Sequence, residues 1–567
     1  MQDGESFDFV IIGAGSSGCV LAHRLSEDGN CRVALVEAGP KDTNPWIHVP
    51  IGYGKTMWND KINWRFHTEP EPTMGGRRIY WPRGRVLGGC SSINGLIVIR
   101  GQQEDYDGWA ARGATGWGFA DVLPYFRKLE DNPSFAGDPL HGVGGPVTVS
   151  SIPRTHELIE AIAQTARTLG VPRTADFNGV RQEGVGYYQL TTRNGLRMSA
   201  AKAYLAPARR RPNLTILTQT QARRILFENA RACGVEVSVG NRIGVIKARR
   251  GVILSAGAVQ SPHLLMLSGI GPAEHLRAQG IDMVMDKPGV GANLQDHLQV
   301  RLLYRCTRPI TTNDALNSWF GRLKMGLDYL LFRRGPLAIG INQGGIFTRV
   351  LLESTTPDIQ FHIGTLSADM AGGQVHDYSG FTLSVCQLRP QSTGWVRLGS
   401  SDPLQPPKIT ANYLATETDR RCILGGMMFA RKLAATAPLK SYVAQEMMPG
   451  PHITDEADLL GFARDHGATI FHPAGTCRIG AENDRDAVVD PRLRVRGIDG
   501  LWVADCSVMP SVVSGNTNIP AIMIGEKAAD MIRADTMNNR GQDKAPHHVH
   551  LGRTQEWPVK RALHAMK

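Results

Sequence analysis

The first forty residues contain three hydrophobic runs, and a glycine-rich turn separates the first run from the second. Residues 7–12 (FDFVII) form a short run of aromatic and β-branched residues, which predicts a buried strand. Residues 19–25 (CVLAHRL) continue with helical spacing, and residues 32–37 (RVALVE) form another strand-like run. The pattern therefore predicts a strand, a tight turn, a helix and a second strand in close succession.

Three apolar runs in the second half of the chain have the length of strands. Residues 358–364 (DIQFHIG) and 381–388 (FTLSVCQL) are typical of buried strands, whereas residues 394–400 (GWVRLGS) alternate between apolar and polar positions. Residues 516–532 (NTNIPAIMIGEKAADMI) predict a helix, with Asn518 as its cap and a proline in the first turn, where a missing N–H costs nothing. The chain therefore combines helices with strands in both halves.

The turn after the first predicted strand has the spacing G-x-G-x-x-G. Gly13 permits the turn, Gly15 lets a pyrophosphate approach the backbone, and Gly18 allows helix and strand to pack closely. The N–H groups at the start of the helix would face the phosphates. Glu37, nineteen residues after Gly18, is placed to bind an adenosine ribose and disfavours NADP. This segment predicts a dinucleotide site and leaves FAD and NAD open.

Length and composition constrain the class of protein. A chain of 567 residues is too long for one small core, so two interleaved domains are expected. The nine cysteines include no C-x-x-C pair, which is typical of reduced thiols in a cytoplasmic protein. The N-terminus has no basic region of the kind that precedes a signal sequence, and no apolar run is long enough to span a bilayer.

The formal charge of +11 does not by itself indicate nucleic-acid binding. The basic residues are dispersed and accompany no RNA- or DNA-binding motif. Residues 536–567 contain six Lys or Arg and two Asp or Glu, a net charge of +4. Three histidines in this segment (His547, His548 and His550) have no further ligands near them in the sequence, so no metal site is predicted. We therefore expect a basic, flexible tail over residues 536–567.

Several longer phrases carry a resemblance to a known family. Residues 81–101 (WPRGRVLGGCSSINGLIVIRG) and 257–272 (GAVQSPHLLMLSGIGP), together with the glycine turn, closely resemble the signatures of the glucose–methanol–choline (GMC) flavin oxidoreductases. The resemblance continues through LQDH, HPAGTCRIG and GNTNIPA and covers nearly all of residues 7–534. Within the family the chain looks most similar to bacterial alcohol dehydrogenases, choline dehydrogenases and hydroxymethylfurfural oxidases.

The resemblance implies a mixed α/β fold. A Rossmann-like FAD-binding domain would be interleaved with a substrate-binding domain built on an antiparallel sheet. The expected parts are the FAD-binding segments 1–150, 196–300 and 475–535, the substrate-domain segments 151–195 and 301–474, and the tail 536–567.

The resemblance also implies which residues bind FAD. They are Gly13, Gly15, Ser16, Ser17, Gly18, Glu37, Ala38, Leu87, Gly88, Gly89, Ser91, Asn94, Gly95, Ala222, Asp505 and Asn518. Some members of the family attach FAD covalently through a histidine at the position of Ile93. Isoleucine cannot form that bond, so non-covalent FAD is expected here.

His472 occupies the position of the family's catalytic histidine, and Asn516 that of its partner. A neutral imidazole suits removal of the hydroxyl proton while a hydride passes to flavin N5. Asn516 would orient the alcohol by a hydrogen bond to its oxygen. The resemblance thus implies oxidation of a primary alcohol. An oxidase that uses O₂ is the near alternative, and a hydroxynitrile-lyase-like enzyme or a non-catalytic flavoprotein are further ones.

The resemblance and the charge of the tail also suggest an electron acceptor and a location. Similarity to bacterial alcohol dehydrogenases favours a quinone or another carrier as acceptor. The basic tail could hold the protein at the inner face of a membrane, where anionic lipids attract Lys and Arg. The sequence indicates neither the particular alcohol nor the oligomeric state.

Overall fold

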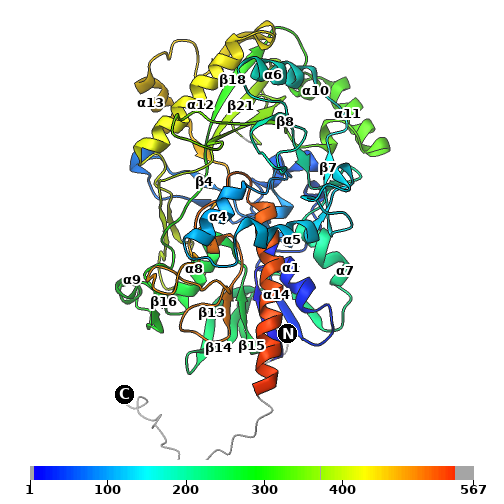
Figure 1. Cartoon of the computed structure of the whole chain (residues 1–567). Coiled ribbons are helices and arrows are strands. Elements are labelled where there is room, and N and C mark those ends of the chain that lie inside the picture. Colours follow the sequence, from blue (N-terminus) through cyan, green and yellow to red (C-terminus); the bar gives the residue numbers. More distant parts are fainter. Residues whose placement is uncertain (1–4, 371, 543–567) are drawn as a thin grey trace, which may run out of the picture.

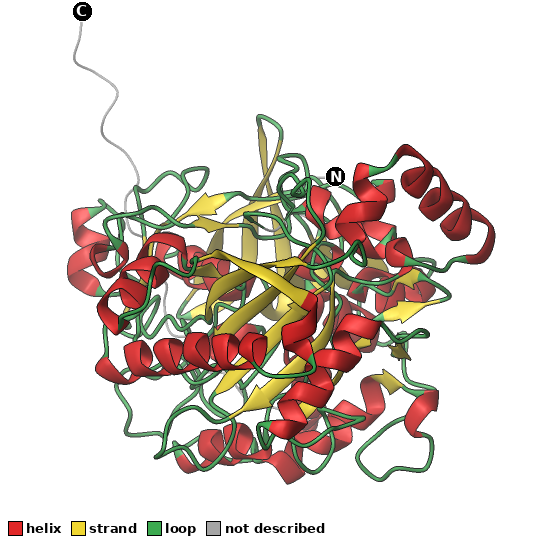
Figure 2. Cartoon of the chain, turned by 90° about the horizontal axis from the view of Figure 1, so that it is seen from above, coloured by secondary structure: helices red, strands yellow, loops and turns green. Residues whose placement is uncertain are grey.

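The computed structural model describes residues 5–370 and 372–542, except for the side chains of the last seven. Two seven-stranded sheets organise the chain, one in the lower and one in the upper half of Figure 1. Helices lie around both sheets, as the view from above shows (Figure 2). This confirms the predicted α/β fold with a second, antiparallel sheet.

The lower sheet contains the predicted strand–turn–helix–strand unit. β1 (Ser6–Ile12) pairs in parallel with β2 (Val33–Val36), and α1 (Ser16–Leu25) connects them. In spatial order the strands are β12 (Leu214–Leu217), β2, β1, β15 (Arg242–Leu254), β14 (Arg231–Val239) and β13 (Gln221–Glu228), and β26 (Leu501–Val503) also pairs with β15. The strands from β12 to β15 are parallel, as in a Rossmann-like sheet.

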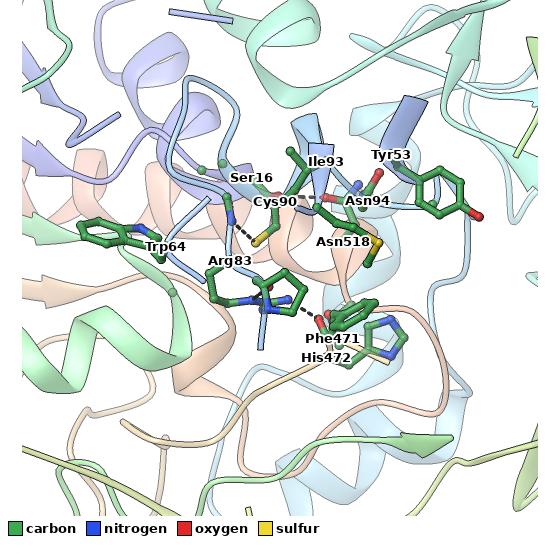
Figure 3. A pocket seen from close by; sticks show the side chains of 18 of the residues that line it. Ser16, Tyr53, Trp64, Arg83, Cys90, Ile93, Asn94, Phe471, His472 and Asn518 are labelled. Carbon is green, nitrogen blue, oxygen red and sulfur yellow. Dashed lines mark hydrogen bonds between the residues drawn. The ribbon is translucent and has the colours of Figure 1, made fainter. Parts of the chain in front are cut away.

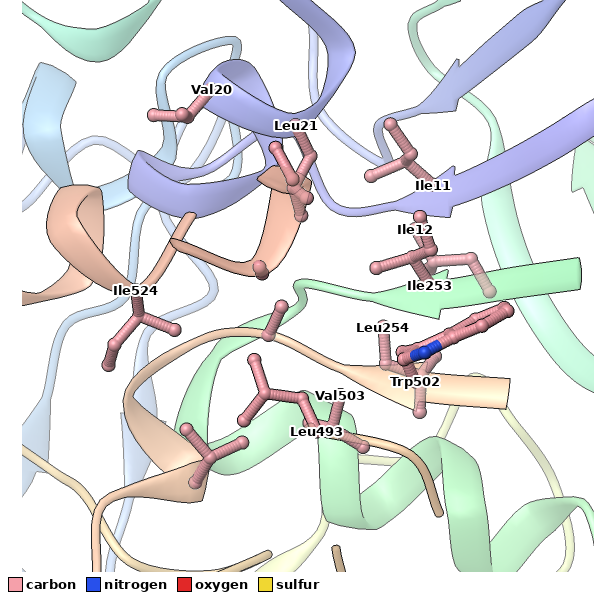
Figure 4. Close-up of a cluster of buried hydrophobic side chains, with 14 of the residues drawn as sticks. Ile11, Ile12, Val20, Leu21, Ile253, Leu254, Leu493, Trp502, Val503 and Ile524 are labelled. Atoms are coloured by element: carbon pink, nitrogen blue, oxygen red, sulfur yellow. The ribbon is translucent and has the colours of Figure 1, made fainter. Parts of the chain in front are cut away.

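The core of the lower sheet joins the two ends of the chain. Side chains of β1, α1 and β15 pack with those of β26 and α14 (Asn518–Gln542) in one buried cluster (Figure 4). Arg24 of α1 forms two hydrogen bonds of 2.9 Å with the Glu526 carboxylate of α14. The Ser17 hydroxyl donates to the Ala521 carbonyl at 2.6 Å. Both ends of α1 are therefore held against the N-terminal part of α14.

The upper sheet is antiparallel throughout. Its spatial order is β24 (Val443–Met448), β18 (Leu298–Cys306), β21 (Gly380–Gln387), β20 (Ile359–Gly364), β19 (Asn342–Thr348) and β8 (Gly184–Tyr187), and β25 (Ala468–Thr469) also pairs with β18. One face packs against α6 (Glu157–Thr168) and α12 (Glu417–Ala435). Alternate side chains therefore point away from these helices, toward the lower half of the molecule.

The remaining longer helices surround the two sheets. They are α4 (Gln103–Ala111), α5 (Phe119–Leu129), α8 (Gly257–Leu267), α9 (Ala273–Ala278), α10 (Thr312–Asn317), α11 (Trp319–Phe332) and α13 (Glu456–His466). Small two-stranded sheets lie between them, including β22 (Trp395–Arg397) paired with β23 (Lys408–Thr410). The predicted strand at residues 394–400 is therefore a short hairpin strand that belongs to neither large sheet.

Two expectations near the C-terminus need correction. α14 continues to Gln542, so the backbone of residues 536–542 is helical and the predicted flexible tail cannot begin at 536. Asn518 is the first residue of α14 and not the residue before it, and its side-chain oxygen accepts a hydrogen bond from the Ser16 hydroxyl at 2.8 Å. Residues 543–567, with His547, His548 and His550, lie outside the described residues.

Within the described residues, no helix is both long and apolar enough to cross a membrane. All nine cysteines belong to this part of the chain, and none of them forms a disulfide.

Candidate active site

A cavity of about 610 Å³ lies between the two sheets. Its walls come from the turn after β1, the segment around residues 82–97, the free face of the upper sheet, and residues 470–473 and 516–521. Figure 3 shows part of this wall, with Trp64 and Tyr53 at opposite sides and His472 below them. Segments that are hundreds of residues apart in the sequence therefore meet around one space.

The turn after β1 forms one end of the cavity. Gly13, Gly15, Ser16 and Ser17 line it. A Cβ on Gly15 would have only the Ser255 carbonyl oxygen near it, at 3.8 Å, so the backbone there faces open space. Gly13 has a φ of +96°, which an L side chain rarely adopts. Together these glycines leave room for a ligand against the backbone at the start of α1.

Glu37 lies in the same wall, at the end of β2, beside Ala38. Its carboxylate accepts hydrogen bonds from the Ala14 N–H at 3.0 Å and the Gly39 N–H at 2.8 Å. Burial raises the pKa of the Glu37 carboxyl to about 7, although these two N–H donors and Arg85 act in the opposite direction. The carboxylate is thus held at the position where the sequence pattern places a ribose-binding group.

The loop of residues 87–95, which we call the small-residue loop, forms a further part of the cavity wall. Its residues Gly89, Asn94 and Gly95 line the cavity, as does Ala222 of β13. A Cβ on Gly89 would lie 2.7 Å from the Gly15 Cα, so the loop presses directly on the turn after β1. The Asn94 side-chain oxygen accepts a hydrogen bond of 2.6 Å from the guanidinium of Arg197.

Four of the sequence-predicted binding residues do not line the cavity: Gly18, Leu87, Gly88 and Ser91. A Cβ on Gly18 would meet the Gly13 carbonyl oxygen, so this glycine lets α1 pack against the strand. The Gly88 N–H donates to the Ala14 carbonyl at 2.8 Å, and the Ser91 hydroxyl donates to the Gly88 carbonyl at 2.6 Å. Leu87 packs against the core of the lower sheet. Gly18 thus serves the packing of α1, whereas Leu87, Gly88 and Ser91 shape the loop.

Asp505 and Asn518 close the cavity from the C-terminal segment. The buried Asp505 carboxylate accepts hydrogen bonds from the Gly257 N–H at 2.8 Å and the Ser261 hydroxyl at 2.6 Å. Burial raises the pKa of Asp505, against the effect of these donors. Asp505 therefore links β26 to the N-terminus of α8 at the cavity wall.

His472 and Asn516 meet in the cavity, 44 residues apart in the sequence. The Asn516 Nδ2 lies 3.2 Å from the His472 Nε2, and both residues line the cavity. The His472 backbone N–H donates to the Asp296 carboxylate at 2.7 Å. The neighbouring Phe471 carbonyl accepts a hydrogen bond from Arg83 at 2.7 Å (Figure 3). The histidine is therefore fixed through its own backbone and through the residue before it.

A chain of hydrogen bonds sets which nitrogen of His472 carries the proton. The His297 Nε2 lies 2.9 Å from the Leu388 carbonyl oxygen, which can only accept, so this nitrogen is the donor. In a neutral ring the other nitrogen is then an acceptor, and it lies 3.0 Å from the His472 Nδ1. His472 therefore carries its proton on Nδ1, and its Nε2 lone pair faces Asn516 and the cavity.

Both rings are held in the neutral form. Burial lowers the pKa of His297 to about 4. Burial also lowers the pKa of His472 well below 6.5, with smaller contributions from His297, His362 and Arg83. A neutral imidazole with an unprotonated Nε2 is the form that can accept a proton from a hydroxyl group.

Five residues at this end of the cavity were not singled out from the sequence: Arg83, His297, Arg301, His362 and Phe471. His297 belongs to the LQDH phrase, which indicated the family but not a role for the ring. Arg301 and His362 lie on strands, and alternation predicts that they share one face only once the sheet is known.

A parallel sheet with a glycine turn, a buried carboxylate at the end of β2 and a neutral histidine in the same cavity is the arrangement expected of a dinucleotide-dependent oxidoreductase. Family models described as GMC oxidoreductase match residues 7–299 and 390–525. The chain belongs to the GMC oxidoreductase family, which confirms the resemblance noted in the sequence.

Known relatives cover nearly the whole chain. The oxygen-dependent choline dehydrogenase of Brucella ovis is 43% identical over 533 residues, which are 93% of this chain and 96% of the relative. The alcohol dehydrogenase [acceptor] of Pseudomonas putida is 40% identical over 529 residues, 93% of this chain and 95% of the relative. A structure of Aspergillus oryzae formate oxidase, in a study of FAD modification, has a TM-score of 0.88 at 28% identity and covers 95% of this chain and 100% of that chain.

FAD is the cofactor of this family, and the cavity fits it. A Cβ on Gly95 would meet nothing within 4 Å, and Gly15 opens onto space in the same way. The backbone therefore leaves a cradle that a flat ring and a pyrophosphate can fill. The residues that would hold FAD run from Glu37 at the adenosine end to the small-residue loop.

We expect the FAD to be released when the protein is denatured. Ile93 lines the cavity and packs with Ile47, Ile62 and Val86, and its hydrocarbon side chain cannot bond to the flavin. Acid precipitation should leave the flavin fluorescence in the supernatant. Fluorescence that remains with the washed polypeptide would contradict a non-covalent cofactor.

Proposed function

We propose that the protein oxidises a primary alcohol to the aldehyde, with His472 as the general base. The observation that carries this proposal is the neutral His472, whose unprotonated Nε2 faces Asn516 inside the FAD cavity. The names of the relatives, a choline dehydrogenase and an alcohol dehydrogenase, support an alcohol as the substrate.

The residues of the chain account for the proton and for the orientation of the substrate. The His472 Nε2 accepts the hydroxyl proton of the alcohol, a role that contributes about 10²–10⁴-fold to such reactions. The Asn516 Nδ2–H donates a hydrogen bond to the same oxygen and so fixes the direction of the carbinol hydrogen. Bound FAD supplies the hydride acceptor at its N5. The alcohol thereby loses one proton and one hydride and becomes the aldehyde.

The pH dependence of the reaction tests the state of the base. Because the folded-state pKa of His472 lies well below 6.5, the imidazole stays neutral as the pH falls from 8 through 6.5. We expect the rate of flavin reduction by the alcohol to be flat across this range in stopped-flow measurements. The prediction would be contradicted if the rate fell with decreasing pH around a midpoint at or above pH 6.5 and this pH dependence disappeared in His472→Gln. The pKa of His472 would then not be lowered by burial.

For the electron acceptor we propose a quinone or another carrier, which the name of the Pseudomonas putida relative supports. The second candidate is an oxidase, because the Brucella ovis relative is named oxygen-dependent and the Aspergillus oryzae neighbour is a formate oxidase. We place the protein in the cytoplasm, at the inner face of the membrane, where a quinone is available.

The acceptor is tested by reoxidation of the alcohol-reduced enzyme. We expect a soluble quinone to reoxidise it faster than air-saturated buffer does, because an acceptor-dependent dehydrogenase delivers electrons to a carrier. Rapid reoxidation by air with one peroxide formed per flavin would establish the oxidase instead.

A further inference from the structure

Strand β18 presents a row of polar side chains to the cavity. His297, just before the strand, contacts His472, and Gln299 and Arg301 line the cavity from the same face. Leu298 and Val300 point the other way, into the core beneath the helices. Four residues of an extended strand span roughly 13 Å, so Arg301 lies roughly that far along β18 from His297, the residue that contacts His472.

Arg301 has no counter-charge. Among the described residues, none forms an ion pair or a hydrogen bond with its guanidinium; burial lowers its pKa, and the neutral Tyr53 hydroxyl acts in the opposite direction. The acidic residues that line the cavity are Glu37 and Asp505, and both carboxylates are engaged by backbone N–H groups at the cofactor end. The residue opposite Arg301 in the sheet is Ser384, which is neutral. A sheltered guanidinium without a partner is unfavourable unless a ligand supplies the anion.

We propose that Arg301 is the binding site for a carboxylate on the substrate, so that the preferred alcohol is a hydroxycarboxylic acid with its two functional groups at opposite ends. Arginine suits this role because its planar guanidinium pairs with a carboxylate through two parallel hydrogen bonds. The same positive charge disfavours choline, whose headgroup is a cation. This assignment rests on the proposed oxidation of an alcohol at His472.

The test compares two alcohols of equal chain length, a linear ω-hydroxy acid and the corresponding primary alkanol. We expect Arg301→Met to lower kcat/KM for the hydroxy acid about 10- to 100-fold and to change that for the alkanol less than threefold. Arg301→Lys should restore part of the loss. Arg305→Met, which removes an exposed guanidinium from the same strand outside the cavity, is the matched control and should change neither value.

Two outcomes would overturn the carboxylate site. One is an equal loss for both alcohols in Arg301→Met, which would show a structural role. The other is an unmodified protein that prefers choline or the alkanol to the hydroxy acid. Either result leaves the proposed oxidation intact, because the alkanol still reduces the flavin. Failure of every alcohol to do so would instead refute the proposed function.

A second inference concerns α11, whose hydrophobic face points away from the protein. Helix α11 buries Met325 and Tyr329, whereas Trp319 and Phe320 are 64% and 75% exposed. The other large apolar side chains exposed on this helix are Leu323, Leu327, Leu330, Leu331 and Phe332. Phe320, Leu323, Leu327 and Leu331 follow one another at intervals of three and four residues, so they form one face. A surface helix ordinarily turns such a face toward the core.

Basic residues border this apolar face. Arg322, Lys324, Arg333 and Arg334 are exposed, and none of them forms an ion pair with a described residue. Asp328 is the one acidic residue between 319 and 334. The combination of an aromatic and leucine face with flanking Lys and Arg is typical of helices that lie in the surface of an anionic membrane.

The helix also adjoins the cavity and lies at the periphery of the upper half of the molecule (Figure 1). Leu316, three residues before α11, lines the cavity, and so does Leu337, five residues after its end. A surface that contacts α11 is therefore next to segments that form the cavity wall.

We infer that α11 binds the surface of a lipid bilayer that contains anionic headgroups. The charge of its border favours this partner over a second copy of the chain, because a two-fold contact would bring two identical basic borders together. Embedded leucine and aromatic side chains would supply the affinity, and the flanking Arg and Lys would contact the headgroups.

The test is sedimentation of the full chain with vesicles, which needs no turnover. We expect binding to phosphatidylcholine vesicles that contain phosphatidylglycerol and much weaker binding to phosphatidylcholine alone. Leu327→Ser with Leu331→Ser should lower the partition coefficient at least tenfold. Lys324→Gln with Arg334→Gln should lower it several-fold for the anionic vesicles. Ile243→Ser with Leu404→Ser, a control pair of equally exposed residues at 59% each, should leave binding unchanged.

Wild-type binding by the Leu327→Ser, Leu331→Ser variant would overturn this inference and assign any lipid affinity to another surface. A dimer in sedimentation velocity that this variant dissociates, without vesicle binding by the unmodified protein, would identify a second copy as the partner instead.

Discussion

The variant His472→Gln is expected to bind FAD normally but to be reduced by a primary alcohol about 10²–10⁴-fold more slowly than the unmodified protein. Glutamine can still pack beside Asn516, but its amide cannot accept a proton. The loss should appear in the rate of flavin reduction under anaerobic stopped-flow conditions, with the flavin spectrum unchanged. Asn516→Ala should also slow this step, since the substrate oxygen then loses its hydrogen-bond donor.

His466→Gln is the matched control for this experiment. His466 ends α13, stacks on Phe462 at a ring distance of 4.4 Å and does not line the cavity. We expect its reduction rate to equal that of the unmodified protein. If His472→Gln reduced its flavin as fast as this control, His472 would not be the base.

The second large effect is expected for Gly18→Ala. A Cβ at this position would lie 1.9 Å from the Gly13 carbonyl oxygen. No change of rotamer can relieve this contact, because the backbone fixes the positions of both the Cβ and the carbonyl oxygen. α1 must then move away from β1, at a cost of about 1–3 kcal/mol or more. We expect a lower Tm and at least tenfold weaker FAD binding, measured by reconstitution of the apoprotein.

Gly461→Ala in α13 provides the control, because a Cβ there would meet nothing within 4 Å. It should leave the Tm and FAD affinity unchanged or raise the Tm slightly, since alanine favours a helix. A Gly18→Ala protein with unmodified Tm and FAD affinity would contradict the close packing of α1 on the strand.

The sequence predicts this fold best where the signals are local. β1, α1 and β2 follow from apolar periodicity and three glycines within forty residues, and the structure has them in that order. β20 and β21 were predicted as buried strands, and both of their faces are indeed covered. The short strand β22 shows the limit, because alternation alone does not tell a hairpin from a strand of a large sheet.

The site was predictable in part for the same reason. His472 and Asn516 stand in phrases that identify them through the family, and the structure brings their side chains within 3.2 Å. The role of His297 was not predictable, because it depends on a contact across 175 residues and on a carbonyl at Leu388. The missing partner of Arg301 was likewise not predictable, because only the folded structure shows which side chains surround its guanidinium.

Helix α11 shows a further limit. Residues 319–332 (WFGRLKMGLDYLLF) have the composition of an amphipathic helix, and such a pattern ordinarily indicates a face that packs on the core. The structure turns most of these apolar side chains outward instead. Periodicity defines the face of a helix but not the direction in which the fold presents it.

The most direct test of the central claim is anaerobic mixing of the purified, FAD-loaded protein with a primary alcohol. The account predicts that the yellow colour of the flavin is lost and that one aldehyde forms per flavin reduced. Colour that persists with every alcohol offered, at full occupancy of FAD, would contradict alcohol oxidation and leave the lyase-like or non-catalytic alternatives.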